Sequence, residues 1–496
     1  MRLFEKLKIF KSFLTNNKEY PIVAAIAAGL YPFFFYYSNN YALVNSREHL
    51  MYFVFSFLLV PILGFVLGYR LFSIRTLLPY RKYVLPFLNF SVFLFLLAIC
   101  HFARIHTKAS ILALVVAALG AYFLHNYIKR IIILQFILAA IGGVMVAGNI
   151  YSELTYSESW VQQPDDIEDV IFKQKPNVYF IQPDGYVNFS ELSQGYYKFE
   201  NSGFEAYLNK EGFKNYDDFR SNYASTLSSN SSMFMMKHHY YGEGISINGS
   251  FASRDIIISK NTVLDVFKRN GYLTHFLTET PYLLLSRPEI GYHKSNFVLK
   301  DVPFISTGFQ SEKLVTDSLP EYLKEDKNKP KFFFIEIFNP GHIRNAKSKS
   351  RGVEGERKAW LDNIEVSNAK LENIIEQIKE NDPNPLIVIL SDHGGYVGFE
   401  YAGEIYTKTT DESKIKSVFS TILSIHWPYG NVPEYDEHLE TSVNIFRVLF
   451  SYLSKNQSYM KNMQDNGSYL VIKKGAPQGV YQYIEPDGSV GFKRLN

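Results

Sequence analysis

The chain has 496 residues, 47% of them hydrophobic and 16% aromatic, which excludes an intrinsically disordered protein and is too long for one ordinary domain. Its net charge of +3 is the sum of two unlike parts: residues 1–150 hold 14 Lys and Arg against 3 Asp and Glu, and residues 151–496 hold 37 against 45. The basic, apolar first part predicts a membrane segment. The acidic remainder predicts a soluble domain and argues against nucleic-acid binding. Because Cys100 is the only cysteine, an intrachain disulfide is excluded.

Five stretches near the N-terminus are apolar and carry no charged side chain. They are Tyr20–Tyr37, Met51–Tyr69, Tyr83–Ala103, Ala109–Ile128 and Ile131–Ser152. Each has roughly the 20 residues that a helix needs to cross about 30 Å of hydrocarbon. A cleavable signal peptide is the alternative for the first stretch, but four more stretches follow it. The sequence therefore predicts a transmembrane domain of five helices over residues 1–152.

The basic residues between these stretches predict the topology. The N-terminal tail and the second and fourth loops would lie on one side of the membrane and carry 11 basic residues, whereas the first and third loops would lie on the other side and carry 3. The richer side holds Arg2, Lys6, Lys8, Lys11, Lys18, Arg70, Arg75, Arg81, Lys82, Lys129 and Arg130, and the other holds Arg47, Arg104 and Lys108. The positive-inside rule then places the N-terminus in the cytoplasm. Five crossings of the cytoplasmic (inner) membrane would put everything after Ser152 on the periplasmic or extracellular side.

Residues 153–176 are polar and are predicted to be a linker, followed by an extracytoplasmic domain over residues 177–496. In this domain short apolar runs alternate with amphipathic segments. The runs are Asn177–Gln182, Tyr272–Thr278, Lys331–Phe338 and Leu386–Leu390, and Lys358–Glu380 has one apolar helical face. Strands that are apolar on both faces and separated by helices indicate an α/β sandwich with a mostly parallel central sheet.

Acidic residues follow two of these strands. Asp184 comes after the first strand, and Asp392 and His393 come after the last, followed by Gly394 and Gly395. Because ligands bind at the carboxyl ends of parallel strands, these side chains are candidates for a divalent-metal site. The alternative for Asp184 is a helix cap or a turn residue. Asp-His-Gly-Gly is the more specific pattern, since glycine allows backbone and ligand to approach closely.

Three motifs in this order resemble one family: PNVYFIQPDGY, then SNYASTLSSNSSM (Ser221–Met233), then LSDHGG. They resemble the alkaline-phosphatase/sulfatase superfamily, and more nearly its membrane-anchored branch of lipoteichoic-acid synthase-like and phosphoethanolamine transferase-like enzymes. The resemblance covers roughly residues 176–455. It implies about five N-terminal helices before an extracytoplasmic catalytic domain, and one divalent metal ion, Mn²⁺ or Zn²⁺ with Mg²⁺ as a further option.

The resemblance also implies roles for individual residues. Asp184, Thr226, Asp392 and His393 would hold the metal, and Thr226 would be the nucleophile, although Ser225, Ser228 and Ser229 are close enough to be confused with it. A metal beside a threonine hydroxyl stabilises its alkoxide, which makes this chemistry reasonable. His342 would act on the leaving-group or acceptor hydroxyl and contact substrate, with a loop histidine of no special role as the alternative.

Arg287 would bind the substrate phosphate through its guanidinium fork, as an arginine does in phosphoglycerol-transferring relatives. Three departures weaken the phosphoglycerol assignment. Thr278 and Leu285 stand where those relatives carry histidine and tryptophan, and Asp184 stands where lipoteichoic-acid synthases use glutamate.

These features predict a membrane-anchored enzyme that moves a phospholipid-derived headgroup, of the phosphoethanolamine or phosphoglycerol type, to an envelope glycan or lipid through a phospho-threonine intermediate. Three alternatives stay open. A sulfatase is suggested by the pattern Ser250-Phe251-Ala252-Ser253-Arg254, although it lacks the usual continuation. A phosphodiesterase would use water as acceptor, and a non-catalytic membrane protein would use the fold to bind a glycan or partner.

Overall fold

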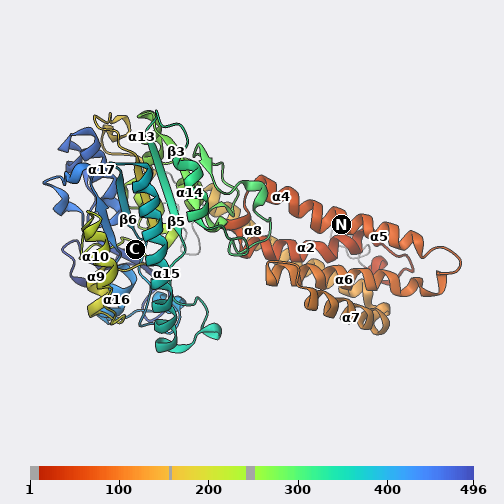
Figure 1. Ribbon diagram of the computed structural model, residues 1–496. Coiled ribbons are helices and arrows are strands. Elements are labelled where there is room, and N and C mark those ends of the chain that lie inside the picture. Colours follow the sequence, from red (N-terminus) through yellow and green to blue (C-terminus); the bar gives the residue numbers. More distant parts are fainter. Residues whose placement is uncertain (1–10, 156–158, 242–251, 496) are drawn as a thin grey trace. The chain divides into compact units, whose positions relative to one another are not determined.

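The computed structural model describes residues 11–155, 159–241 and 252–495. The basic residues Arg2, Lys6 and Lys8, and Ser250 and Phe251 of the sulfatase-like pattern, lie outside the described residues. The chain divides into two compact units. The membrane unit contains the residues up to Thr155 together with Leu285–Arg287 and Val302–Thr307, and the catalytic unit contains the others. Figure 1 labels their elements.

The membrane unit is built from long apolar helices. They are α2 (Pro21–Asn39), α4 (Arg47–Phe53) continuing through a π-helical turn (Val54–Leu59) into α5 (Val60–Leu71), α6 (Arg81–Phe102), α7 (Thr107–Leu124) and α8 (Ile128–Leu154). Four stretches are long and apolar enough to cross a membrane: Pro21–Asn39, Arg47–Leu71, Leu78–Phe102 and Thr107–Val161. The last of these contains both α7 and α8. Four candidate spans are therefore present, and five separate crossings stay a prediction.

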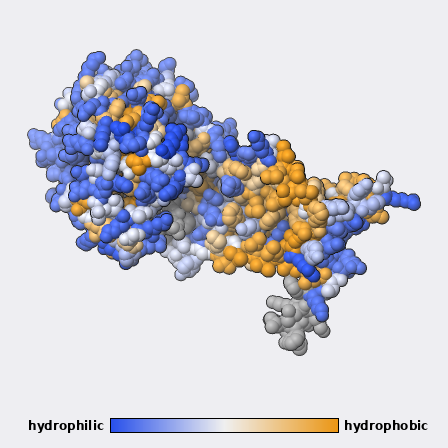
Figure 2. Space-filling view, turned by 90° about the horizontal axis from the view of Figure 1, so that it is seen from below, coloured by the Kyte–Doolittle hydropathy of each residue, from blue (hydrophilic) through white to orange (hydrophobic). Residues whose placement is uncertain are grey.

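The surface of these helices is apolar, as Figure 2 shows by the orange side chains gathered over them. Leu63, Leu67 and Phe123 are each more than 60% exposed, which is unfavourable in water and natural in lipid. Inside the unit, the amides of Asn89 and Gln135 bond each other at 2.9 Å in both directions. Buried polar groups of the helices thus find partners on neighbouring helices, as the hydrocarbon core requires.

The catalytic unit contains a seven-stranded sheet. Its strands are β1 (Val178–Pro183), β2 (Lys214–Asn215), β3 (Leu273–Thr278), β4 (Lys294–Ser295), β5 (Lys331–Ile337), β6 (Leu386–Leu390) and β7 (Leu423–His426). They lie in the order β2-β7-β6-β1-β5-β3-β4. The five strands from β6 to β4 run parallel, and β7 and β2 pair antiparallel at one side. The prediction of an α/β fold with a mostly parallel sheet is confirmed.

Helices cover both faces of this sheet because its central strands are apolar on both faces. On one face, Phe180 and Phe334 pack against α11 (Thr226–Met235) and α17 (Ile445–Ser454), and Phe332 packs against α13 (Thr262–Arg269). The opposite face carries a larger core shared with α10 (Ser202–Lys210), α14 (Val315–Leu323), α15 (Gly352–Asn381) and α16 (Glu412–Phe419). Figure 1 shows α15 lying along the sheet.

Three further strands form a small antiparallel sheet near the C-terminus. They are β8 (Ser468–Ile472), β9 (Gly479–Ile484) and β10 (Val490–Arg494). The catalytic unit also contains two short helices, α9 (Phe189–Gln194) and α12 (Ser253–Ile258). A bridge between Tyr223 and Tyr469 ties the small sheet to the segment that leads into α11.

Candidate active site

The contacts of Phe234 fix the position of α11 over the sheet, and successive turns of the helix then lie over successive pairs of strand residues. Phe234 packs on Phe180 of β1 and on Phe334 of β5, with ring centroids 6.3 and 5.0 Å apart. One helical turn rises about 5.4 Å, and two strand residues span about 6.6 Å. Two turns before Phe234, Thr226 therefore reaches the carboxyl edge of the sheet, where Asp184 follows β1.

Three metal-binding side chains meet at this edge. Oδ1 of Asp184 and Oδ2 of Asp392 each lie 3.3 Å from Nε2 of His393. One ligand atom from each of the three residues lies within 4.8 Å of the others. Asp392 and His393 are fully buried, and Asp184 is 9% exposed. Within the described residues this is the one group of three such side chains with that spacing.

The chemistry of the three donors fits a cation. Nδ1 of His393 donates to the carbonyl of Gly394 at 2.8 Å, so that Nε2 presents its lone pair to the carboxylates. The facing oxygens, Oδ1 of Asp184 and Oδ2 of Asp392, have no hydrogen-bond partner. Three buried acceptors that face one another repel, and a divalent ion between them would satisfy all three. These residues could hold a metal ion.

The pKa shifts of Asp184 and His393 also indicate a functional site. Burial, and after it the charge of Asp392, raises the pKa of Asp184 to about 7. Burial disfavours the charged form of His393, but the carboxylates of Asp392 and Asp184 outweigh burial and raise its pKa. Strongly shifted groups gathered in one place are typical of functional sites.

Thr226 adjoins the three side chains. Its hydroxyl lies 3.4 Å from Nε2 of His393 at the first residue of α11. The neighbouring hydroxyls have other partners: Oγ of Ser225 and Oγ of Ser228 lie 2.6 Å apart, and Ser229 donates to the carbonyl of Tyr223 at 2.7 Å. Among the residues considered for the nucleophile, Thr226 is the one with a hydrogen bond to His393 in the described part of the chain.

His342 stands beside the same group in the loop after β5. Its ring centroid lies 5.8 Å from that of His393, and Tyr396 stacks on both rings at 5.2 and 5.1 Å. Nδ1 of His342 donates to the carbonyl of Ile343 at 2.6 Å, which leaves Nε2 as an acceptor. Burial and then the charge of His393 lower the pKa of His342 to about 4. At neutral pH the imidazole of His342 is therefore uncharged.

Helix α15 holds the His342 loop along one face. Trp360 donates to the carbonyl of Gly341, Asn363 to that of Pro340, Ser367 to that of Asn339, and Lys370 to the side chain of Asn339. The loop also closes on the metal-binding strand end, because the amide of Gly341 donates to the carbonyl of Asp184 at 2.8 Å. A Cβ on Gly185, whose φ is +68°, would come within 2.2 Å of the Gly341 carbonyl, so this approach requires glycine.

A pocket of about 420 Å³ opens at these residues. It is lined by Asp184, Thr226, His342 and His393, together with a largely aromatic wall of Tyr282, Phe309, Phe338, Tyr396 and Tyr406. This wall could not be predicted from the sequence, because its members come from separate loops. Tyr396 is the one member that its sequence position could have indicated, because it lies two residues after the pair His393-Gly394. Its hydroxyl donates to the carbonyl of Ala224, just before the segment that holds the proposed nucleophile.

Arg287 is the remaining residue of the predicted site. It belongs to the membrane unit, where its guanidinium lies 4.4 Å from the ring centroid of Phe304 and donates to the carbonyl of Val302 at 3.0 Å. Phe304 also packs against two rings of α4, Tyr52 at 4.5 Å and His49 at 5.4 Å. Arg287 is not among the described residues that line the pocket. Its role toward a substrate phosphate stays a prediction.

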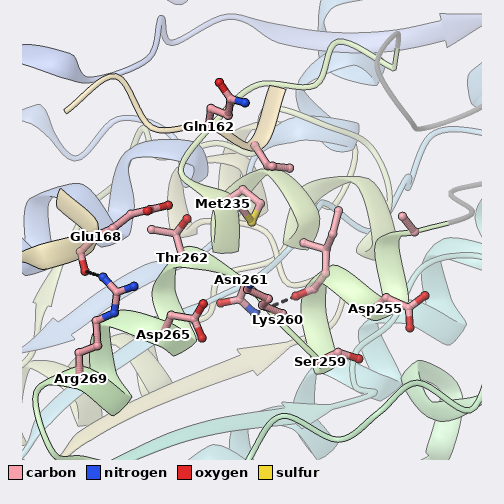
Figure 3. A pocket seen from close by; sticks show the side chains of 13 residues that line it. Gln162, Glu168, Met235, Asp255, Ser259, Lys260, Asn261, Thr262, Asp265 and Arg269 are labelled. Atoms are coloured by element: carbon pink, nitrogen blue, oxygen red, sulfur yellow. Dashed lines mark hydrogen bonds between the residues drawn. The ribbon is translucent and has the colours of Figure 1, made fainter. Parts of the chain in front are cut away.

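A second pocket of about 410 Å³ lies in the catalytic unit between α12, α13 and residues 161–168 (Figure 3). Two of its side chains make structural bonds. Arg269 donates to the carbonyl of Glu168 at 2.7 Å and pairs with Asp169, and Asn261 caps α13 through the amide of Leu264. The bonds of Arg269 tie residues 168 and 169 to α13.

Comparison with solved structures finds several similar chains. The C-terminal periplasmic domain of EcEptC from Escherichia coli is 13% identical, with 63% of this chain and 96% of that chain covered and a TM-score of 0.42. The lipoteichoic acid synthase LtaP from Listeria monocytogenes is 14% identical, with 67% and 91% covered and a TM-score of 0.42. The phosphonate monoester hydrolase of Agrobacterium radiobacter is 11% identical, with 61% and 82% covered and a TM-score of 0.39. None of the three bears on the activity of this chain.

A comparison with curated proteins gives no match. The family comparison does. The sulfatase family model matches residues 187–454, more than half of the 496 residues. The matched range includes Thr226, His342, Asp392 and His393, and the resemblance to the alkaline-phosphatase/sulfatase superfamily that the motifs predict is confirmed. The chain therefore belongs to the sulfatase family.

Proposed function

We propose that this protein is a membrane-anchored, metal-dependent transferase that moves a phospholipid-derived headgroup to an envelope glycan or lipid through a phospho-threonine intermediate. The observation that carries the proposal is the hydroxyl of Thr226, 3.4 Å from His393 and beside two buried carboxylates in an open pocket. Asp184, Thr226, Asp392 and His393 are the proposed metal ligands. Their donor set of oxygens and one imidazole suits Mn²⁺, Zn²⁺ or Mg²⁺.

The residues of the chain have separate tasks in this reaction. A bound divalent ion would stabilise the alkoxide of Thr226 and the charge on the phosphoryl oxygens. Oγ1 of Thr226 attacks phosphorus and forms a P–O bond, the P–O bond to the lipid glycerol breaks, and the hydroxyl proton of Thr226 passes to the departing glycerol oxygen. In the second half, the acceptor hydroxyl attacks the phospho-threonine and releases Thr226.

His342 suits the second half of the reaction. Its Nδ1 is held by the carbonyl of Ile343, and its low pKa keeps Nε2 unprotonated at neutral pH. A neutral imidazole with a free Nε2 can accept the proton of the acceptor hydroxyl as that hydroxyl attacks. The bonds from α15 fix the loop that carries it, which favours a stable position. Arg287 stays our proposed phosphate contact.

The membrane unit supports transfer from a lipid. We propose five crossings, in which α7 and α8 span separately, because a 3₁₀ turn at His125–Tyr127 divides them and α7 packs on α6 while α8 packs on α2. With the basic residues of the loops on the inner side, five crossings would put residues 153–496 on the outer side of the cytoplasmic membrane. A catalytic domain tethered there works at the bilayer surface, where lipid headgroups lie.

The proposal is tested in cells. Envelope lipids and glycans are compared by mass spectrometry between cells that carry the wild-type protein and cells that carry Thr226→Ala at equal abundance. We expect one phospho-substituent to be missing with Thr226→Ala, and its mass would identify both donor and acceptor. Identical profiles would contradict envelope transfer.

Hydrolysis is the second candidate, and membership of the sulfatase family favours it. Water would then resolve the covalent intermediate in place of the acceptor hydroxyl. The purified protein distinguishes the two, because a hydrolase releases phosphate or sulfate from a soluble ester at the same rate with and without added lipid or glycan acceptor. A transferase accelerates when the acceptor is supplied.

A further inference from the structure

Two basic segments flank one loop of the pocket that holds Thr226. The loop contains a 3₁₀ helix, Ala402–Tyr406, four residues of which line the pocket. The first segment is residues 344–351, with four basic residues and no acidic one. The second consists of Lys408 and the two residues after β8. Together they form a basic rim of seven exposed residues: Arg344, Lys347, Lys349, Arg351, Lys408, Lys473 and Lys474.

The first segment adjoins the His342 side of the pocket. The amide of Ala402 donates to the carbonyl of Arg344 at 2.9 Å, which ties the segment to the start of the 3₁₀ helix. Arg344 follows His342 by two residues, and Asn345 lines the pocket. A ligand group bound by this segment therefore lies beside the histidine that we propose to accept the proton of the acceptor hydroxyl.

The second segment adjoins the other end of the same 3₁₀ helix. The amide of Lys473 donates to the carbonyl of Tyr406 at 2.8 Å, and the ammonium of Lys473 lies 4.7 Å from the centroid of the Tyr406 ring. The amide of Lys408 donates to the carbonyl of Lys474 at 2.9 Å, so the three lysines form one group. Because a 3₁₀ helix rises about 2 Å per residue, the two segments are attached about 10 Å apart.

The charge of the rim is opposite to that of its domain, since residues 151–496 hold 45 Asp and Glu against 37 Lys and Arg. Carboxylates that lie among the rim cations are engaged in bonds of the fold. Glu356 accepts from the amide of Arg344 at 3.0 Å, and Glu404 accepts from the amide of Glu400 at 2.8 Å. Glu400 pairs with Lys347 at 3.2 Å. Cations gathered around a pocket raise the local concentration of anionic ligands.

The rim and the pocket together define the class of ligand. Lys349 and Lys474, one from each segment, make no ion pair within the described residues, so both are available to anions. A single phosphate would leave one segment unused, whereas an extended chain with several anionic groups matches both. The pocket wall is aromatic, and Phe309 in this wall is 57% exposed, so the apolar face of a sugar ring can pack there.

We propose that the basic rim binds the acceptor, and that the acceptor is an anionic glycan with phosphate or carboxylate groups along its chain. The glycan lies across the mouth of the pocket, its anions pair with the two segments, and one of its hydroxyls reaches His342. A flat membrane surface would match the cations but could not enter the pocket beside them. The inference rests on the proposed function and names the acceptor class that the proposed function leaves open.

Equilibrium binding tests the rim without turnover. The full chain in phosphatidylcholine nanodiscs, with no donor present, is titrated into a fluorescently labelled oligogalacturonate, which carries one carboxylate on each sugar, and binding is read as fluorescence anisotropy. We expect the wild type to bind this chain and to lose affinity for it as salt is added. A neutral malto-oligosaccharide of the same length should bind at least about tenfold more weakly.

Two double charge reversals test the two segments separately. Lys473→Glu with Lys474→Glu, and Lys349→Glu with Arg351→Glu, should each weaken the binding of oligogalacturonate about tenfold, because each reversal removes two attractions and adds two repulsions. Since the substituted side chains are exposed, thermal unfolding should be nearly the same in all chains. A loss of affinity in both variants would show that one ligand spans both segments.

The matched control is Lys327→Glu with Lys329→Glu. These two lysines are also exposed, and they lie in the turn before β5, at the edge of the sheet opposite to the pocket. The control changes the net charge of the chain by the same amount as each rim variant. It should leave the affinity for oligogalacturonate unchanged.

Three binding results would overturn the inference. One is equal affinity for oligogalacturonate and the neutral chain, and another is a rim variant that binds as tightly as the control. The third is displacement of the labelled chain by inorganic phosphate or by phosphatidylglycerol vesicles as effectively, at equal concentration of anions, as by unlabelled oligogalacturonate. Phosphate would then assign the rim to a single anion, and the vesicles would assign it to a membrane surface.

Envelope profiles separate this inference from the proposed function. We expect Lys473→Glu with Lys474→Glu to lower the same phospho-substituent that Thr226→Ala removes. If Thr226→Ala removes a substituent and the rim fails the binding tests, the proposed function stands and the inference is wrong. If the rim passes them and Thr226→Ala leaves the envelope unchanged, the acceptor role is refuted together with the proposed function.

Discussion

The identity of the nucleophile can be tested by a set of four variants around the start of α11. Thr226→Ala removes the hydroxyl that lies 3.4 Å from His393, and Thr226→Ser keeps a hydroxyl at the same position. Ser225→Ala and Ser228→Ala remove hydroxyls that bond each other at 2.6 Å. The four changes are at three positions between residues 225 and 228, so any general effect on the start of α11 should appear in all of them.

The structure sets the expected magnitudes. Thr226 makes one long hydrogen bond and is half-buried, so Thr226→Ala should cost less than about 1 kcal/mol of folding free energy. Loss of a covalent nucleophile lowers kcat by on the order of 10⁴- to 10⁶-fold, about 5–8 kcal/mol of activation free energy. Thr226→Ser should keep a measurable part of the activity, and Ser225→Ala should stay within about tenfold of the wild type.

The assay is turnover of a chromogenic phosphodiester by the purified full chain with excess divalent metal, read beside bound metal and thermal unfolding. Thr226→Ala should fold, keep its metal through Asp184, Asp392 and His393, and lose turnover. A loss smaller than tenfold in Thr226→Ala beside an inactive Ser225→Ala or Ser228→Ala would assign the nucleophile to a serine. Full activity in all the alanine variants would refute covalent catalysis.

Three other predictions address the metal, the stability and the topology. Asp392→Asn should weaken metal binding more than about a hundredfold, about 3 kcal/mol, because it exchanges a buried charged ligand for a neutral one, and unchanged metal titrations would move the site elsewhere. Burial raises the pKa of Glu191 to about 7, above its unfolded value of 4.5, so this group's contribution to stability is complete below pH 4.5 and is lost as the pH rises through 7. Denaturant titrations should therefore show Glu191→Gln to be more stable than the wild type at pH 8 by up to about 3 kcal/mol and no more stable at pH 4, and equal stabilities at pH 8 would contradict this. A phosphatase reporter fused after Ser152 should be active and one fused at Arg75 inactive; the reverse pattern would refute the topology and the lipid-donor argument with it.

The central strands could be predicted from sequence because each is a complete apolar run bounded by turn residues. The run Leu386–Leu390 forms β6 with the same ends, and the run at residues 331–338 forms β5 to within one residue. The edges of the sheet could not be predicted in this way. β2 and β4 are two residues long, and β7 is a four-residue antiparallel strand, so each depends on a distant partner and not on its own pattern.

The residues of the site show the same difference between features that a local sequence pattern predicts and features that depend on distant partners. Asp184, Asp392 and His393 follow strands directly, so sheet geometry alone indicates that they meet, and the structure brings them together. The aromatic wall consists of residues that are ordinary in sequence and come together only in the folded chain. Arg287 shows the opposite case: its motif identifies a residue type, whereas the direction of its side chain depends on a left-handed backbone at φ +58° and on Phe304.

The packing of α11 on the sheet relates the hydrophobic core to the position of Thr226. Along the helix, Phe234, Asn230 and Thr226 follow one another by single turns, and along β1 the sequence Phe180, Gln182 and Asp184 follows by steps of two. Residues in the same place of the two series are first apolar and then polar. At the carboxyl edge they are the proposed nucleophile and a proposed metal ligand. Because a helix moves as a rigid body, any slide of α11 at Phe234 displaces Thr226 from Asp184 by the same distance, and about 1 Å of misplacement in an active site can lower the rate about 10²-fold. The apolar contact of Phe234 with Phe334 therefore contributes to catalysis as well as to stability, since it fixes how far the nucleophile reaches beyond the sheet.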